Sequence, residues 1–273
     1  MHTNEKIILE QYQLSYKLYK GGERYLFLFH GFGQTSDVFD SFIPSVLPEY
    51  TVISIDLFFH GESTIHDMHQ NFISIDTWNV IFDELLKKHS ISFFSMLSFS
   101  IGARFIVSLF EQKCNMIDRI VLIAPDGFGN TFWFSVATAT SINRFIFRYS
   151  LANPASIRFF VNLFYFLRLI DGVTKRFLEK TISTDEQRQK IYNTWVYLRK
   201  LKLPAIDFIK QINSCTALIM CLVGKDDQLV AKQKIYDICI ETDGLYIELD
   251  YTHSKMLQAI DRPEVKEFLI SDR

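Results

Sequence analysis

The chain has 273 residues, of which 48% are hydrophobic and 22% charged, and its 29 basic and 31 acidic side chains give a net charge of -2. This length accommodates one large α/β domain or a core domain with an insertion, and the composition excludes a disordered chain. The balanced charge provides no overall field that would attract nucleic acid, so we expect no nucleic-acid partner.

Short apolar strands alternate with helical stretches along the first half of the chain. Residues 7–9 and then 12–19 are strand-like, and a Gly-Gly turn separates them from a further strand at 24–29. The segments that follow are a helix at 38–47, a strand at 50–57, a helix at 77–89, a strand at 91–97, a helix at 101–112 and a strand at 119–124. This alternation predicts a mostly parallel sheet with helices on both faces.

The alternation stops at Pro125-Asp126-Gly127 and resumes with a strand at 217–223, a helix at 231–239, a strand at 245–249 and a helix at 255–270. The residues between have helical periodicity and are too apolar for a disordered linker. The sequence therefore predicts a core domain, 1–127 and 206–273, with a helical insertion, 128–205, after the sixth predicted strand.

The ends and the cysteines indicate the cellular setting. Residues 1–6 are polar and lack the apolar core of a signal peptide, and no run of about 18 apolar residues occurs that would span a membrane. The four cysteines have neither the spacing of a metal site nor the density of a disulfide scaffold. We therefore expect a cytoplasmic protein with reduced thiols at Cys114, Cys215, Cys221 and Cys239.

Ser100 stands between an apolar run and the start of a helix, in the pattern Ser98-x-Ser100-x-Gly102. A serine on so abrupt a strand-to-helix turn is lifted out of the backbone, beside the unpaired N–H groups of the new helix. The same serine is also suited to capping that helix. The pattern alone leaves two interpretations, a nucleophile and a helix cap.

A nucleophilic serine needs a histidine base and a carboxylate that fixes the tautomer of the imidazole. His253 follows the last predicted strand, and its side chain can reach the carboxyl edge of the sheet, where catalytic groups gather in such folds. His30 and His60 each precede a glycine in a turn, and we expect them to hold loop structure. The remaining histidines are expected on the surface: His2, His66, His69 and His89.

The carboxylate is expected in the turn Gly224-Lys225-Asp226-Asp227, which ends the penultimate strand. One of the two aspartates should face the histidine and the other the solvent, and counting three residues on from Gly224 favours Asp227. Asp126, at another strand end, is a third candidate or a cap for the start of the insertion.

An oxyanion that develops on a substrate carbonyl requires two preorganised N–H donors. The N–H of Ile101 at the helix start is one. The loop His30-Gly31-Phe32-Gly33, whose glycines let the backbone approach a ligand closely, offers a second. The same glycines also suit an ordinary tight turn between a strand and a helix.

These residues resemble the α/β-hydrolase superfamily, in particular its cap-bearing ester hydrolases, C–C hydrolases and prolyl aminopeptidases. The resemblance runs over about residues 12–268, with the insertion similar in position alone. It rests on five segments in the family's chain order: an oxyanion loop at 30–33, a loop at 56–63, the nucleophile elbow at 98–102, the acid turn at 224–227 and the final His253.

The resemblance implies an α/β-hydrolase fold and a serine hydrolase with Ser100 as nucleophile, His253 as base and Asp227 as acid. It makes the backbone N–H of Phe32 an oxyanion donor beside that of Ile101, and it implies no metal and no organic cofactor. Serine at the elbow argues against the family's epoxide hydrolases and haloalkane dehalogenases, which use a carboxylate nucleophile.

Two positions depart from the family pattern. Ser98 stands where glycine is usual in the elbow, and Phe59 stands where glycine is usual after Asp56. Ser98 is small enough to permit the turn. The bulkier Phe59 is expected to reshape one wall of the entrance.

The predicted insertion is rich in aromatic residues and arginines and poor in acids. We expect the aromatics to bury the cap on the sheet domain and part of them to roof an apolar pocket. A narrower hypothesis is that this cap favours substrates with an apolar acyl part and an anionic group, or makes weak contact with an anionic membrane surface. The aromatic set is Phe132, Trp133, Phe134, Phe145, Phe147, Phe159, Phe160, Phe164, Tyr165 and Phe166.

The leading prediction is a hydrolase that acts on a small, largely apolar ester or a related acyl compound. The triad alone also permits C–C bond hydrolysis or a prolyl-aminopeptidase-like activity. The alternative from another class is a binding protein that keeps the fold with weak or no catalysis.

Overall fold

The computed structural model of the protein describes residues 2–67, 72–128, 132–166, 172, 175, 176, 179 and 182–271. The chain forms two compact units, which we call the sheet unit (Met1–Gly129 and Lys200–Arg273) and the helical unit (Asn130–Arg199). The helical unit begins and ends inside the expected insertion, 128–205. Residues 200–205 belong to the sheet unit because the apolar side chains of Leu201 and Leu203 are buried there.

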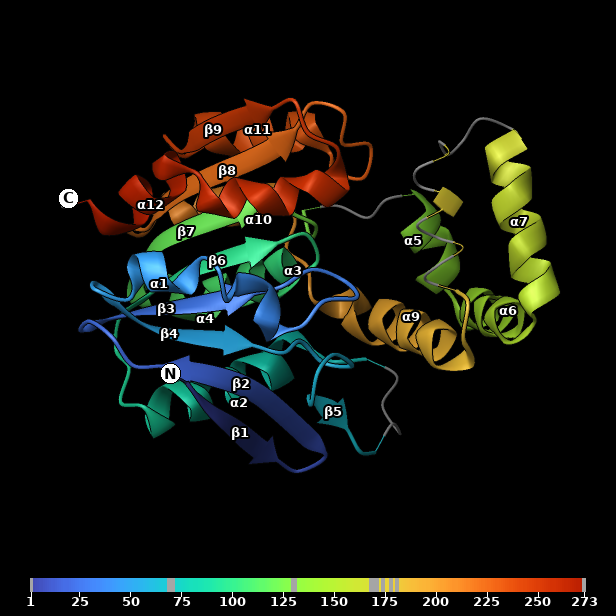
Figure 1. The fold of residues 1–273 in the computed structure, drawn as a ribbon, viewed down its shortest axis with the longest axis horizontal. Coiled ribbons are helices and arrows are strands. Elements are labelled where there is room, and N and C mark those ends of the chain that lie inside the picture. Colours follow the sequence, from blue (N-terminus) through green and yellow to red (C-terminus); the bar gives the residue numbers. More distant parts are fainter. Residues whose placement is uncertain are drawn as a thin grey trace. The chain divides into compact units, whose positions relative to one another are not determined.

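A single mostly parallel sheet organises the sheet unit (Figure 1). Its strand order is β1-β2-β4-β3-β6-β7-β8-β9, with the short β5 paired to β2, and only the pairings of β2 with β1, β4 and β5 are antiparallel among the described residues. The strands are β1 (Thr3–Leu9), β2 (Tyr12–Tyr19), β3 (Arg24–Phe29), β4 (Tyr50–Ile55), β5 (Thr64–Ile65), β6 (Phe94–Phe99), β7 (Ile117–Ile123), β8 (Leu218–Gly224) and β9 (Leu245–Leu249).

The burial of each strand follows its place in the sheet. Every residue of β6 and β7 is buried, as expected for central parallel strands that are covered on both faces. The edge strand β1 instead exposes most of its residues and carries charged side chains, which discourage pairing with another chain. The mostly parallel sheet predicted from the sequence is therefore confirmed.

Helices cover both faces of this sheet (Figure 1). On one face α1 contacts α12, and on the other α10 contacts both α4 and α11. The helices of the sheet unit are α1 (Ile43–Val46), α2 (Ile75–Lys88), α3 (Gly102–Val107), α4 (Phe110–Lys113), α10 (Ala205–Ile212), α11 (Lys232–Glu241) and α12 (Pro263–Ile270), with 3-10 turns η1 (Ser36–Phe39), η2 (Cys114–Met116) and η4 (His253–Asp261).

The helical unit is built from α5 (Phe132–Thr138), α6 (Ser141–Ala152), α7 (Pro154–Phe166) and α9 (Asp185–Tyr197), followed by the 3-10 turn η3 (Leu198–Lys200) at its boundary. Two of these helices have clear start signals. Thr140 caps α6 through the N–H of Asn143, and Thr184 forms a capping box with Gln187 at the start of α9. No helix of the described residues is long and apolar enough to cross a bilayer.

Several predicted elements are shorter than expected. The helix predicted at 38–47 is two separate turns, η1 and α1, and the helix at 101–112 breaks into α3 and α4. Between α3 and α4 the Ser108 hydroxyl donates to the carbonyl of Arg104, and this bond competes with the backbone hydrogen bonds of the helix. The short β5 was not predicted. Because β5 adds one strand to the count, the sixth predicted strand, at 119–124, is β7 in the structure, and the insertion follows it.

Candidate active site

Ser100 occupies a strained turn between β6 and α3. Its φ is +52°, in the left-handed region that residues other than glycine seldom adopt. The turn is held from both sides, since the Ser100 N–H donates to the carbonyl of Ile123 (2.9 Å) and its own carbonyl accepts the N–H of Asp126 (3.1 Å). Ser100 is therefore not an ordinary helix cap: the backbone around it is bent and fixed.

The small residues beside Ser100 make this turn possible. A Cβ on Gly102 would overlap the carbonyl oxygen of Phe29 and lie 2.8 Å from that of His30, so β3 passes where only a glycine fits. Ser98, the departure from the family pattern, is fully buried, and within the described residues its hydroxyl has no hydrogen-bond partner. The turn thus tolerates serine at position 98 sterically, at the cost of an unsatisfied hydroxyl.

Three side chains from three loops of the sheet unit form a hydrogen-bonded chain. Ser100 Oγ lies 3.0 Å from His253 Nε2, and His253 Nδ1 lies 2.7 Å from Asp227 Oδ2. The Asp227 side chain is fully buried, and its other oxygen accepts the N–H of Leu229 at 2.8 Å. Since an ionised carboxylate only accepts, Nδ1 carries the proton, which leaves Nε2 to accept from the serine hydroxyl.

The two alternative carboxylates do not join this chain. Asp226 is exposed to solvent. Asp126 instead receives two hydrogen bonds from the Arg104 guanidinium, at 2.7 Å from Nε and 3.0 Å from Nη2. This ion pair was not expected from the sequence. The ion pair fixes Asp126, whose N–H donates to the Ser100 carbonyl. In the sequence, the only indication of this pair is an arginine placed one helical turn after Ser100.

Three of the four N–H groups of residues 31–34, in the loop after β3, donate hydrogen bonds. The N–H of Gly31 donates to Gln34 Oε1 (2.8 Å), that of Gly33 to His60 Nε2 (3.0 Å) and that of Gln34 to the carbonyl of Gly31 (3.3 Å). Within the described part of the chain, neither the Phe32 N–H nor the Ile101 N–H donates a hydrogen bond. Both expected donors therefore have no competing hydrogen bond among the described residues.

Two histidines hold this loop, as predicted. His30 is fully buried; its Nε2 accepts the N–H of Leu57 (3.0 Å) and its Nδ1 donates to the carbonyl of Gly31 (2.7 Å). His60 donates from Nδ1 to the carbonyl of Phe58 while its Nε2 accepts from Gly33. Each imidazole therefore has both nitrogens engaged in loop structure.

The prediction that His89 lies solvated on the surface is wrong. It packs against Tyr16, whose hydroxyl lies 2.8 Å from His89 Nε2, and burial lowers the pKa of the imidazole. His2 and His66 are exposed as expected, and His69 lies outside the described residues. His89 was missed because its partner comes from a strand far away in sequence.

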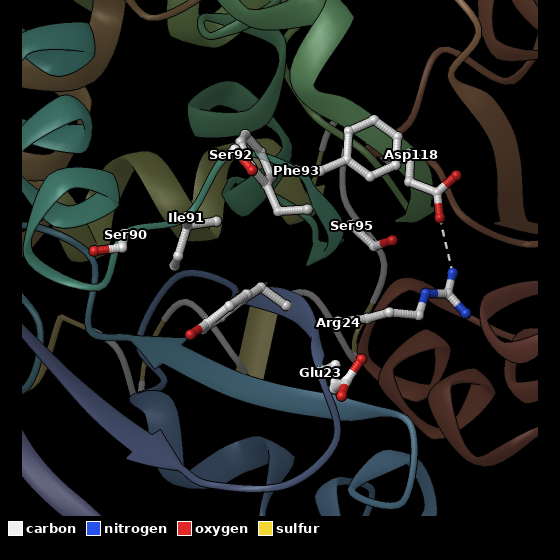
Figure 2. Close-up of a pocket in the computed structure, with 10 residues that line it drawn as sticks. Glu23, Arg24, Ser90, Ile91, Ser92, Phe93, Ser95 and Asp118 are labelled. Carbon is white, nitrogen blue, oxygen red and sulfur yellow. Dashed lines mark hydrogen bonds and ion pairs between the residues drawn. The ribbon is translucent and has the colours of Figure 1, made fainter.

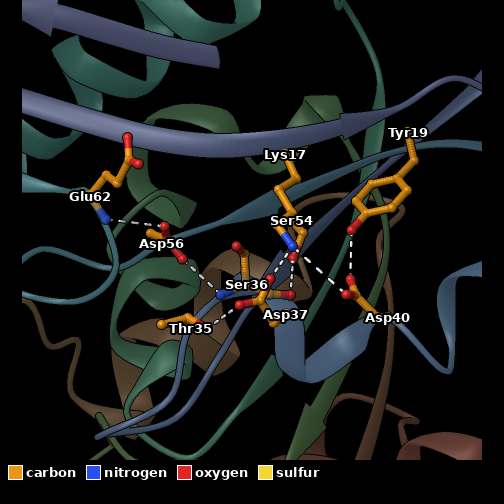
Figure 3. Close-up of polar contacts among 9 residues, drawn as sticks. All are labelled: Lys17, Tyr19, Thr35, Ser36, Asp37, Asp40, Ser54, Asp56 and Glu62. Atoms are coloured by element: carbon orange, nitrogen blue, oxygen red, sulfur yellow. Dashed lines mark hydrogen bonds and ion pairs between the residues drawn. The ribbon is translucent and has the colours of Figure 1, made fainter. Parts of the chain in front are cut away.

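The loop after β4 is braced by Asp56 (Figure 3). One carboxylate oxygen accepts the N–H of Ser36 at 2.7 Å and the other that of Glu62 at 3.3 Å. Phe59 within this loop has a φ of +69°, a conformation that glycine would adopt without strain. Phe59 thus has a backbone conformation that suits glycine, and it adds a half-buried ring to the loop.

A surface pocket lies at the opposite edge of the sheet (Figure 2). It has a volume of about 310 Å³ and is lined by residues 23–25 and 90–95 and by Asp118, which pairs with Arg24 at 2.8 Å. These residues lie at the beginnings of β3, β6 and β7, whereas Ser100 follows the end of β6. Six strand residues separate the two places by roughly 20 Å, so this pocket is not part of the candidate site.

Known proteins share this architecture. A family model described as "alpha/beta hydrolase fold" matches residues 25–239. An alpha/beta hydrolase enzyme from a Medee basin deep-sea metagenome library is similar in structure, with a TM-score of 0.72 at 12% identity over 98% of each chain.

Two further solved structures are similar at comparable identity. The carboxylesterase CesB from Bacillus subtilis has a TM-score of 0.65 at 13% identity, over 100% of this chain and 93% of that one. The thioesterase domain from the curacin biosynthetic pathway has a TM-score of 0.63 at 12% identity, over 99% and 100%. No curated protein sequence matches the chain. At such identities the structural likeness concerns the fold.

The close approach of β3 to the elbow predicts a large effect of Gly102→Ala. The added methyl group would meet backbone carbonyls that cannot rotate away, so we expect a loss of about 2–3 kcal/mol in the free energy of unfolding, measured in urea. The matched control is Ser98→Ala, which removes an unsatisfied hydroxyl and should leave stability unchanged or raise it by about 1 kcal/mol. A Gly102→Ala protein as stable as the unsubstituted one would show that the turn is not closely packed.

Proposed function

Because the chain belongs to the family of α/β-hydrolase-fold proteins, we propose that it is a serine hydrolase that transfers the acyl group of a small, largely apolar ester to water. The observation that carries this proposal is the hydrogen-bonded chain from Ser100 through His253 to buried Asp227. The strained turn supports it, since backbone strain at a position held by its surroundings is typical of functional sites. The esterase and thioesterase titles of similar structures agree with this class.

In the proposed mechanism, Ser100 Oγ attacks the substrate carbonyl while His253 Nε2 accepts the hydroxyl proton. The negative charge on the carbonyl oxygen is stabilised by the N–H groups of Phe32 and Ile101. Asp227 stabilises the imidazolium and keeps Nδ1 protonated. His253 then donates its proton to the leaving alcohol, which breaks the ester bond and leaves Ser100 acylated.

The second half of the reaction repeats these roles with water. His253 accepts a proton from the water that attacks the acyl-enzyme, and it returns this proton to Ser100 Oγ as the carboxylic acid departs. No step requires a metal or an organic cofactor. C–C bond hydrolysis and prolyl-aminopeptidase-like activity use the same triad, and no described residue favours them over ester hydrolysis.

Three further expectations belong to this proposal. We assign the choice of substrate to the helical insertion expected at 128–205, as a cap. A small molecule with an apolar part is the proposed partner, and the cytoplasm the proposed location.

Labelling by a fluorophosphonate separates a catalyst from a binding protein of the same fold. We expect the unsubstituted protein to be labelled, because the reagent traps an activated serine hydroxyl, and Ser100→Ala to give no label. Ser98→Ala is the matched control, since it removes a second hydroxyl from the same turn and should keep full labelling. Labelling that survives Ser100→Ala, or an unlabelled native protein, would contradict the proposal.

The neighbouring aspartates provide a second test. In Asp227→Asn the amide donates to Nδ1, so the imidazole proton moves to Nε2 and the serine hydroxyl loses its acceptor. We expect kcat for a chromogenic p-nitrophenyl ester to fall about 10⁴-fold. The exposed Asp226→Asn should change kcat less than about twofold, because its charge is screened by solvent. Similar losses in both variants would show that Asp227 has no special role.

A further inference from the structure

The helix α6 exposes an apolar stripe. Its four members are spaced i, i+3, i+4 and i+7, so they share one face of the helix. Each is more than half exposed: Ile142 71%, Phe145 70%, Ile146 57% and Tyr149 64%. A contiguous apolar stripe of this kind on the surface of a helix marks a binding surface.

The opposite side of α6 already serves the core of the helical unit. Phe147 packs against Trp195 and Tyr192 of α9, with ring centroids 5.4 and 5.9 Å apart, and Leu151 is buried. α6 therefore has two apolar faces. One packs in the core of the helical unit, and the exposed stripe is the other.

The next helix, which contacts α6, also exposes apolar side chains. On α7, Arg158, Phe159, Tyr165 and Phe166 are all exposed, with Phe166 at 80%. At 100° per residue these positions fall within about one third of the helix circumference. We call the four residues of the α6 stripe together with these four the α6–α7 face.

The segment that carries this face has charged side chains of one sign. Residues 127–170 contain four arginines and no aspartate or glutamate. Arg148 and Arg158 are exposed, and no ion pair joins either to a residue that the structure describes. The Arg148 guanidinium lies 5.8 Å from the ring centroid of Tyr192. A second copy of the same face would place arginines against arginines, which is unfavourable, whereas phosphate groups would neutralise them.

We propose that the α6–α7 face docks the protein on an anionic lipid bilayer. The apolar stripe would lie at the boundary of the acyl chains, the tyrosines at the depth of the headgroups, and Arg148 and Arg158 against lipid phosphates. α6 has 12 residues and rises about 18 Å, less than a hydrocarbon core, so the helix lies in the plane of the interface. This inference is independent of the proposed ester hydrolysis.

Co-sedimentation of the full chain with lipid vesicles tests the proposal. We expect binding to vesicles of phosphatidylcholine mixed with phosphatidylglycerol, much weaker binding to phosphatidylcholine alone, and release as the salt concentration rises. Arg148→Gln and Arg158→Gln should each lower the partition coefficient about fivefold. Their control is Lys202→Gln, an exposed cation of the sheet unit, which should leave it unchanged.

A second pair of variants tests the contribution of the apolar stripe to vesicle binding. Phe145→Ser combined with Ile146→Ser should lower the partition coefficient at least about tenfold, whereas Ile206→Ser, 68% exposed in the sheet unit, should have no effect. Circular dichroism and fluorophosphonate labelling check that each variant is folded.

Three results would overturn the proposal. The first is equal sedimentation of the unsubstituted protein with both vesicles or with neither. The second is a dimer in size-exclusion chromatography that the Phe145→Ser and Ile146→Ser double variant dissociates, which would assign the face to a second copy. The third is binding to polyglutamate with none to anionic vesicles, which would indicate an acidic protein as the partner.

Discussion

The turn from β6 into α3 is the constraint on which the candidate site depends. A left-handed backbone at a serine costs about 1–3 kcal/mol, so it persists only where its surroundings hold it. At Ser100 they do so through β7, which accepts the serine N–H, through the Asp126 N–H, which binds its carbonyl, and through β3, which passes against Gly102. The Arg104 ion pair fixes Asp126 in turn. Folding of the central strands therefore provides the free energy that presents the hydroxyl.

The common direction of the central strands explains why the other groups meet Ser100. β3, β6 and β8 are parallel, so the Phe32 loop, Ser100 and Asp227 leave the sheet at one edge, and β9 brings His253 to the same edge. The pocket beside Arg24 lies at the opposite edge. The sheet thus separates the proposed chemistry from the Arg24–Asp118 ion pair.

The sequence predicts best where a single local rule determines the structure. The central strands are continuous apolar runs because both faces are buried, and the strands at 24–29 and 245–249 have the expected bounds. Other features could not be predicted from a local pattern. The short β5 and the Tyr16 contact of His89 depend on partners that are distant in sequence, and the helix at 101–112 is divided by a hydrogen bond from the Ser108 side chain.

At the candidate site, the spacing from Gly224 favoured Asp227. The burial of Asp227 and its hydrogen bond to His253 distinguish it from the exposed Asp226. The aromatics of the insertion were expected to be buried, yet Phe145 and Phe166 are exposed, because periodicity identifies an apolar face and not its partner.

The central claim is that Ser100 becomes acylated during turnover. Mass spectrometry of the protein, quenched in acid during hydrolysis of a p-nitrophenyl ester and then digested, locates the acyl group directly. The account predicts an acyl adduct on the peptide that contains Ser100, with the modification on that residue, and no adduct in the Ser100→Ala protein. Turnover with the acyl group on another residue, or with no adduct when product release shows a burst, would contradict it.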